Sequence, residues 1–112
     1  MIHNAIGRHR KRWCLSQGEL AKLLSVSQSV ISRLELGASP PDLRSLVGLQ
    51  VVFGLTLKSL FPHLYRTVEE HVMRQAVSID RATASAHDFR TQTKRRLLQR
   101  MIQHAEGPTP VI

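Results

Sequence analysis

Cationic side chains are the residues whose number and spacing most clearly favour a chemical role in this sequence. Sixteen Lys and Arg stand against eight Asp and Glu, which gives a formal net charge of +8. Guanidinium and ammonium groups in such excess favour a polyanionic partner, either nucleic acid or an anionic membrane surface. A C-terminal cluster without an intervening acid consists of Arg90, Lys94, Arg95, Arg96 and Arg100. This cluster is interpreted as a solvated helix face, a second DNA contact, or a surface for an acidic protein or membrane.

Nucleophiles and metal ligands form no comparable grouping. The six histidines are scattered, with neither cysteine partners nor a pair four residues apart, so we expect no metal site. Cys14 is the single cysteine and cannot form an internal disulfide; we expect it to pack beside Trp13 rather than to sense redox state. Neither a glycine-rich phosphate loop nor a nucleophile–base–acid set is visible. We therefore expect no enzyme and no cofactor.

The amino-acid composition narrows the classes of fold and function that remain. A chain of 112 residues with 42% hydrophobic residues predicts one small domain with an appendage. Aromatic residues make up only 4%, which argues against a stacking platform for single-stranded nucleic acid. The longest apolar stretch is interrupted well short of the roughly 20 residues that cross a membrane, and no apolar run follows the N-terminal charges. We expect a cytoplasmic protein without a membrane segment.

Apolar residues recur at spacings of three and four throughout, which predicts an all-α fold. The first helix carries Ile6, Arg10 and Trp13 on one face. The second covers residues 17–24, and Ser16 with Glu19 has the spacing of a capping box. The third covers residues 27–36, and Gly37 is well suited to end it.

The rest of the chain predicts further helices. We expect a fourth helix ending near Gly54, a short fifth over residues 56–60, and two more over about 63–81 and 86–104. The fourth is expected to carry Leu43, Leu46, Val47, Gln50 and Val51 at helical spacing. The helix over about 63–81 carries a narrow apolar seam of Leu64, Val68, Val72, Ala76 and Ile79. Because a thin seam needs a partner, we expect a helix-turn-helix domain over 1–61, a dimerising extension over 62–106 and a tail over 107–112.

Two short helices around a tight turn, in a basic chain, suggest a helix-turn-helix. Residues 15–37 read LSQGELAKLLSVSQSVISRLELG. This run resembles the Cro/CI-type (XRE) family of DNA-binding regulators, and the resemblance extends over about residues 2–61. It implies a five-helix, lambda-repressor-like DNA-binding domain with a helical C-terminal extension. In that family the third helix enters the major groove of double-stranded DNA.

The resemblance implies roles for particular residues. The base-reading residues would be Gln28, Ser29 and Ser32, since a Gln pairs with adenine through two hydrogen bonds. The phosphate contacts would be Gln17, Lys22, Arg33 and Arg44. Arg10 and Glu35 match positions that form a buried ion pair in some members. The plainer alternative for the reading residues is an ordinary polar helix face.

This sequence departs from the family pattern in three places. Ser25 stands where the turn usually has Gly, and a left-handed Ser there costs on the order of 1 kcal/mol. Cys14 replaces a common Gly at the end of the first helix. Leu36 stands where a polar residue is usual, and an exposed Leu36 could instead pack against the C-terminal extension.

Taken together, these features predict a sequence-specific transcriptional regulator, a dimeric repressor on an inverted-repeat operator. One alternative is an antitoxin or accessory regulator whose C-terminal helices bind a protein partner. Another is an interaction adaptor whose helix-turn-helix no longer binds DNA. RNA is the weaker nucleic-acid candidate, because the major groove of A-form RNA does not admit a helix.

Overall fold

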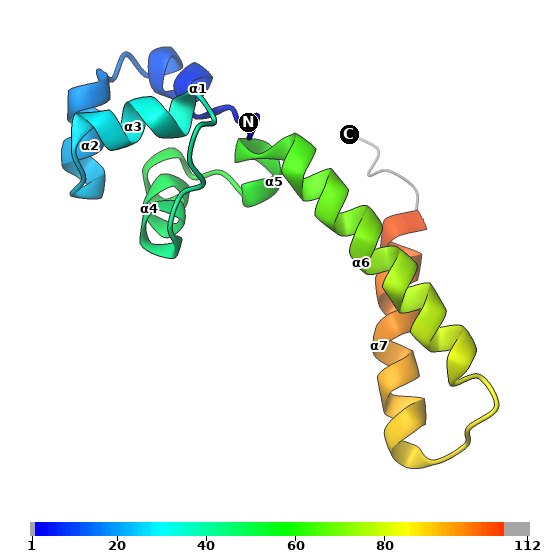
Figure 1. Cartoon of the computed structure of the whole chain (residues 1–112). Helices are drawn as coiled ribbons and strands as arrows, with labels where there is room; N and C mark the ends of the chain where they lie inside the picture. The colour runs from blue at the N-terminus through cyan, green and yellow to red at the C-terminus, as the bar shows by residue number, and fades with distance from the viewer. Residues whose placement is uncertain (1, 107–112) are drawn as a thin grey trace. The chain divides into compact units, whose positions relative to one another are not determined.

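The computed structural model describes residues 2–106, with side chains through residue 104. Within this range every regular element is an α-helix, which confirms the predicted all-α fold (Figure 1). The helices are α1 (Ile6–Arg12), α2 (Gln17–Leu24), α3 (Gln28–Glu35), α4 (Leu43–Phe53), α5 (Leu57–Leu60), α6 (Pro62–Ala82) and α7 (Phe89–Glu106). The tail expected over 107–112 lies outside the described residues.

The chain forms two compact units. The first is Met1–Arg66 and contains α1 to α5, and the second begins at Thr67 within α6. Each of the five helices of the first unit contributes one large, fully buried side chain to its core. These residues are Ile6, Leu20, Ile31, Leu49 and Leu60. A core that draws on all five helices gives α2 and α3 a rigid support.

The N-terminal segment is fastened to the ends of two other helices. The Asn4 side chain accepts a hydrogen bond from the backbone N–H of Ile6 and donates one to the carbonyl oxygen of Leu34 at 2.8 Å. The backbone N–H of Ala5 donates to Leu60 at 2.8 Å. These bonds hold the start of α1 against the end of α3 and against α5.

The end of α1 differs from expectation. Trp13 is 65% exposed rather than on the buried face, because α1 ends at Arg12 and Cys14 turns the chain at a φ of 59°. Cys14 is itself exposed, so its expected packing role beside Trp13 is wrong. A left-handed backbone is a conformation that glycine adopts without strain, which fits the glycine of the family pattern at this position.

The residues expected along α4 do not form its buried side, although Leu46 packs partly against the core. Leu43 and Val51 are 77% and 78% exposed, and Val47 is exposed as well. The buried residues of α4 are Ser45 and Leu49 instead. Seven of the eleven residues of this helix are apolar and they lie on several sides of it, so spacing alone did not determine which side faces the core. Asp42 begins the helix, where its carboxylate accepts a hydrogen bond from the backbone N–H of Ser45 at 2.8 Å.

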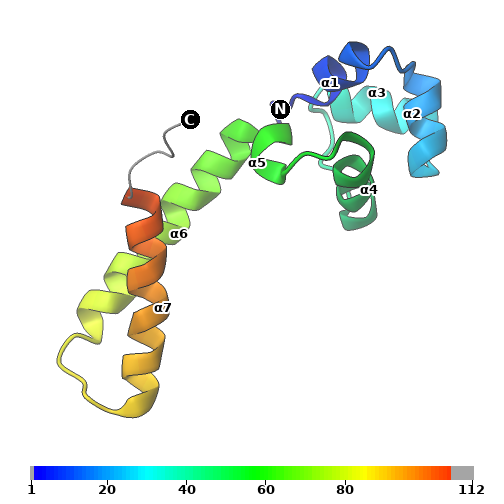
Figure 2. The same ribbon diagram turned by 180° about the vertical axis from the view of Figure 1, so that it is seen from behind.

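The second unit is a hairpin of α6 and α7, which run side by side in opposite directions (Figures 1 and 2). Two helices form rather than one continuous rod. Asp88 caps α7 by accepting a hydrogen bond from the backbone N–H of Thr91 at 3.0 Å. The buried apolar residues of the hairpin are Ala76 and Leu98. Of the expected seam on α6, only Ala76 faces inward, while the seam's larger residues, Leu64, Val68, Val72 and Ile79, are exposed.

Candidate nucleic-acid interface

Helix α2 begins with a complete capping box. The Ser16 hydroxyl accepts a hydrogen bond from the backbone N–H of Glu19 at 3.0 Å, and the Glu19 carboxylate accepts one from the backbone N–H of Ser16 at 2.9 Å. The backbone hydrogen bond from Ser16 is the main reason that the pKa of Glu19 lies below its ordinary value. Both groups satisfy backbone donors that an uncapped helix leaves open.

A tight turn separates α2 from α3. Ser25 adopts the left-handed conformation with φ 58° and ψ 42°, as expected for a position usually held by glycine. The backbone N–H of Val26 donates back to Ala21 at 3.0 Å. Ser27 then begins α3, but its side chain does not cap the helix and instead shares a hydrogen bond with the Ser29 hydroxyl at 3.0 Å. The turn therefore sets the direction of α3 through backbone geometry.

Helix α3 has two chemically different sides. Ile31 and Leu34 are buried in the core, and Val30 packs partly against it. Gln28 and Ser29 at its start are exposed. Because one side is held by apolar packing, the polar side presents amide and hydroxyl groups in a fixed orientation.

Three of the four residues expected to contact phosphate are exposed: Lys22, Arg33 and Arg44. Arg44 is the second residue of α4, one position after the helix begins. The fourth, Gln17, is partly buried, and its Nε2 donates to Oε1 of Glu35 at 3.1 Å. Gln17 therefore uses its side-chain donor within the protein.

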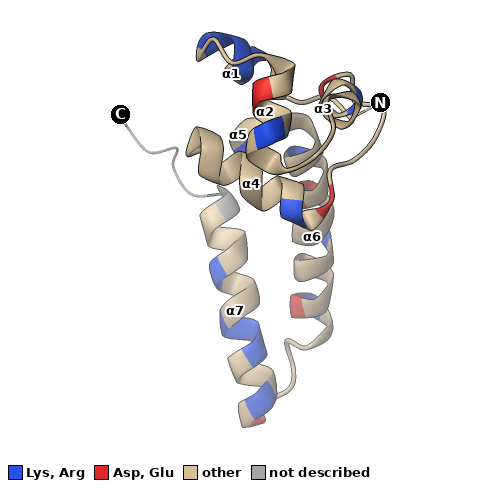
Figure 3. Cartoon of the chain, turned by 90° about the vertical axis from the view of Figure 1, so that its left-hand side faces the viewer, with Lys and Arg blue, Asp and Glu red and all other residues tan. Residues whose placement is uncertain are grey.

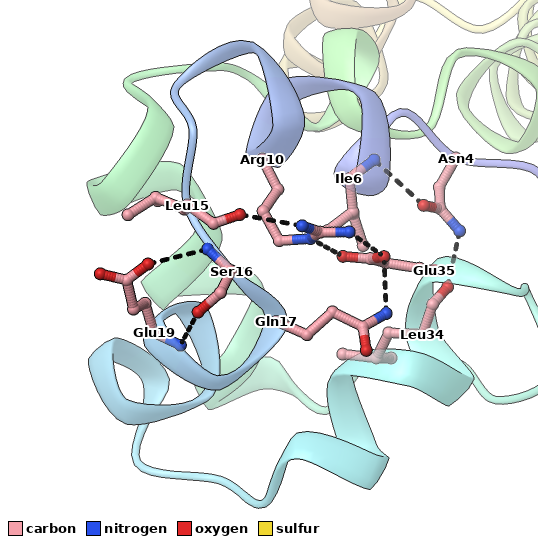
Figure 4. A network of polar contacts seen from close by, with 9 residues as sticks. All are labelled: Asn4, Ile6, Arg10, Leu15, Ser16, Gln17, Glu19, Leu34 and Glu35. Carbon is pink, nitrogen blue, oxygen red and sulfur yellow. Dashed lines mark hydrogen bonds and ion pairs between the residues drawn. The ribbon is translucent and has the colours of Figure 1, made fainter.

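A polar network joins α1, α2 and the end of α3 (Figure 4). Arg10 donates through Nε to Oε2 of Glu35 at 2.6 Å and through Nη2 to Oε1 at 3.0 Å. Its Nη1 donates to the carbonyl oxygen of Leu15 at 2.8 Å. The paired side chains are only 10% and 11% exposed. This is the ion pair that the resemblance implied.

The network shifts the titration of both partners. Burial raises the pKa of the Glu35 carboxyl, but hydrogen bonds from Arg10 and Gln17, together with nearby positive charge, outweigh it and bring the pKa below its ordinary value. The hydrogen bond to Glu35 raises the pKa of Arg10. Both groups are therefore charged at neutral pH, and their bonds fix α3 relative to α1.

A cleft of about 520 Å³ opens beside this network. Ser32 lines it and is half-buried, unlike the exposed Gln28 and Ser29. Arg8 and Lys11 of α1 line the same cleft. The cleft was not expected from the basic residues of the first helix, for which a solvated face and a contact near the DNA backbone were both open, and Asn4 was missed although an Asn just before a helix is a common capping residue.

The C-terminal basic cluster divides into two parts. Arg90, Lys94, Arg96 and Arg100 are exposed on α7, which carries several bands of basic residues (Figure 3). Arg95 is partly buried and donates to Oδ1 of Asp80 at 2.9 Å. Arg95 thus joins the two helices of the hairpin, whereas the other four side chains face solvent.

Comparison with known protein families gives a match over part of the chain. Residues 15–60 match the family model described as helix-turn-helix. No curated protein and no solved structure matches the chain. No helix in the described part of the chain has the length and hydropathy needed to cross a membrane. The described residues also contain no cluster of three or more His, Cys, Asp or Glu side chains that could hold a metal ion.

Proposed function

We propose that residues 15–60, which match a helix-turn-helix family model, act as a DNA-binding domain of the Cro/CI (XRE) type and make the protein a sequence-specific regulator of transcription on double-stranded DNA. The observation that carries this proposal is the two-sided character of α3. Its apolar side is held in the core through Ile31 and Leu34, while Gln28 and Ser29 stand exposed at its start. A helix of this kind can enter the major groove with its first residues against the base edges.

The proposed reading residues differ in strength. The Gln28 amide offers one donor and one acceptor in a single plane, which matches N6 and N7 of adenine and contributes about 1–3 kcal/mol of discrimination. Ser29 either donates or accepts, so it specifies weakly. Ser32 reads from the edge of the cleft, because its side chain is half-buried there.

In the proposal, a second set of residues contacts the DNA phosphates. Lys22, Arg33 and Arg44 supply exposed positive charge. Gln17 contributes through the N-terminus of α2, where backbone N–H groups and the helix dipole favour an anion. The exposed cations of α7, namely Lys94, Arg96 and Arg100, form a second contact with the DNA backbone. Such contacts position the protein and carry no base preference.

The regulator is proposed to act as a homodimer that represses transcription by occupying its operator. Two recognition helices related by a two-fold axis would enter successive major grooves about 34 Å apart, so the operator is an inverted repeat. The second unit, with its exposed apolar residues, supplies the dimer contact. A protein that works on chromosomal DNA in this way resides in the cytoplasm, at the nucleoid.

Selection of bound duplexes from a random pool tests the proposal. The expected result is an inverted repeat whose affinity falls steeply with salt, because Lys and Arg displace counterions from the phosphates. A single asymmetric site would contradict the symmetric dimer. Failure to enrich any duplex, with no salt-dependent binding, would support the adaptor alternative instead.

A further inference from the structure

One side of α6 carries residues at alternating spacings of four and three. They are Val68, Val72, Gln75, Ile79 and Ala82. We call this set the α6 stripe. Its spacing is that of the contact positions in a helix pair, where every seventh residue repeats the same place. The stripe is apolar except for one amide at its centre.

The α6 stripe remains open to solvent although α7 packs beside it. Val68, Val72 and Ile79 are 51%, 39% and 44% exposed. Helix α7 instead covers the neighbouring side of α6, where Ala76 is buried and Asp80 accepts from Arg95. The hairpin therefore uses a different side of α6 for its own packing.

The charges of α6 avoid the stripe completely. At about 100° per residue, every charged side chain of this helix lies more than a quarter turn from the centre of the stripe. These residues are Arg66, Glu69, Glu70, Arg74, Asp80 and Arg81. Depletion of charge together with exposed apolar side chains is typical of the centre of a protein interface. The absence of charge is notable in a chain with a net charge of +8.

The distribution of charge also indicates which helix of the hairpin a second copy would contact. Exposed Leu97 of α7 has Lys94 three residues before it and Arg100 three residues after it. A second copy approaching through α7 would bring like charges together, which is unfavourable. An approach through the α6 stripe brings no like charges together. The stripe of the second copy also has the same spacing of apolar residues. The amide of Gln75 can donate and accept, so it can pair with its own counterpart.

We propose that two copies of the chain associate through the α6 stripe, with Gln75 facing Gln75 of the second copy across the two-fold axis. This inference rests on the dimer proposed above and names its surface. A polar residue at one contact position sets the register and the number of helices, at some cost in stability. Gln75 therefore selects a pair of helices in one alignment.

Cysteine cross-linking of the full chain tests the alignment. In a Cys14→Ser background, Gln75→Cys places two thiols on the axis, within the Cα separation of about 4.4–6.8 Å that a disulfide requires. We expect nearly complete disulfide-linked dimer after mild oxidation. The matched control, Glu70→Cys, is exposed on the opposite side of α6 and should remain largely monomeric on a denaturing gel. Equal cross-linking of both variants, or none at Gln75→Cys, would overturn the proposal.

Mass measurement by light scattering separates this inference from the proposed function. The unmodified chain is expected at twice 12.7 kDa. Val72→Glu should shift it to the monomer with its helix content unchanged, whereas Arg74→Glu should leave the dimer intact. A dimer that survives Val72→Glu would refute the stripe while leaving DNA binding standing. A monomeric unmodified chain would refute both the stripe and the proposed dimer.

Discussion

Arg10 of α1 and Glu35 at the end of α3 are joined by two hydrogen bonds, Nε to Oε2 at 2.6 Å and Nη2 to Oε1 at 3.0 Å. The contact links helices whose Arg and Glu are 25 residues apart in sequence. It therefore determines where the recognition helix lies relative to α1. Gln17 bonds to the same carboxylate, so α2 shares the anchor.

Breaking this pair from one side should be costly. Glu35→Gln leaves the Arg10 charge without its counterion, and removal of one partner from a buried pair costs on the order of 3 kcal/mol. Urea unfolding at pH 7 measures the loss. The double variant Arg10→Met with Glu35→Leu should recover most of it, because no charge is then left alone. A double variant as unstable as the single one would contradict this account of the pair.

The same pair predicts a dependence on acid. Because the folded-state pKa of Glu35 is below its ordinary value of 4.5, the stability it contributes is present above that pH and is lost as the pH falls through the folded value. The unfolding free energies of the native chain and Glu35→Gln should therefore differ at pH 7 and converge as the pH falls through the folded-state pKa of Glu35. A difference that does not shrink at any acid pH at which the chain stays folded would show that the carboxylate charge is not responsible.

Two glycines with similar backbone angles should respond differently to alanine. Gly54 has φ 63° and open space where a Cβ would stand, so Gly54→Ala should cost only about 1 kcal/mol of backbone strain. Gly37 has φ 73°, and a Cβ there would collide with the carbonyl oxygen of Ile2. Gly37→Ala should cost at least about 2 kcal/mol more. Equal losses in urea unfolding would mean that the N-terminal segment moves away freely.

The turn between α2 and α3 offers a stabilising change. Ser25 is left-handed, and Ser25→Gly should stabilise the domain by up to about 1 kcal/mol because glycine adopts this conformation without strain. Ser25→Ala is the matched control, since it removes the hydroxyl but keeps the Cβ, and it should bring no gain. Thermal unfolding of the two variants gives the comparison, and a gain with Ala equal to that with Gly would contradict the role of backbone strain.

Sequence reasoning located the first-unit helices well because strong local signals mark their ends. Ser16 with Glu19 marks the start of α2, and Gly37 and Gly54 follow α3 and α4. Sequence reasoning failed where the spacing of apolar residues does not show which side of a helix is buried. In α4 almost any side could be buried, and the side that faces α2 is set by tertiary packing of Leu24 over Gly48.

The residues that join the two helices of the hairpin were missed for a different reason. Its small interior is built around Ala76, Leu98 and the Asp80–Arg95 ion pair, and a pattern of large apolar residues does not reveal such a contact. The larger residues of the expected seam, by contrast, are exposed on α6 and remain open to the partner that a thin seam needs. Likewise, the hydrogen bond from Gln17 to Glu35 depends on how α2 packs against α3, and no local sequence pattern predicts that packing.

The central claim is that the exposed start of α3 reads bases. It is tested most directly by selecting duplexes from one random pool in parallel with the native chain, Gln28→Ala and Arg44→Ala. The account predicts that Gln28→Ala loses preference at one or two positions of each half-site, with about 1–3 kcal/mol of affinity, while Arg44→Ala weakens all sequences alike. Identical base preferences for all three proteins would contradict it.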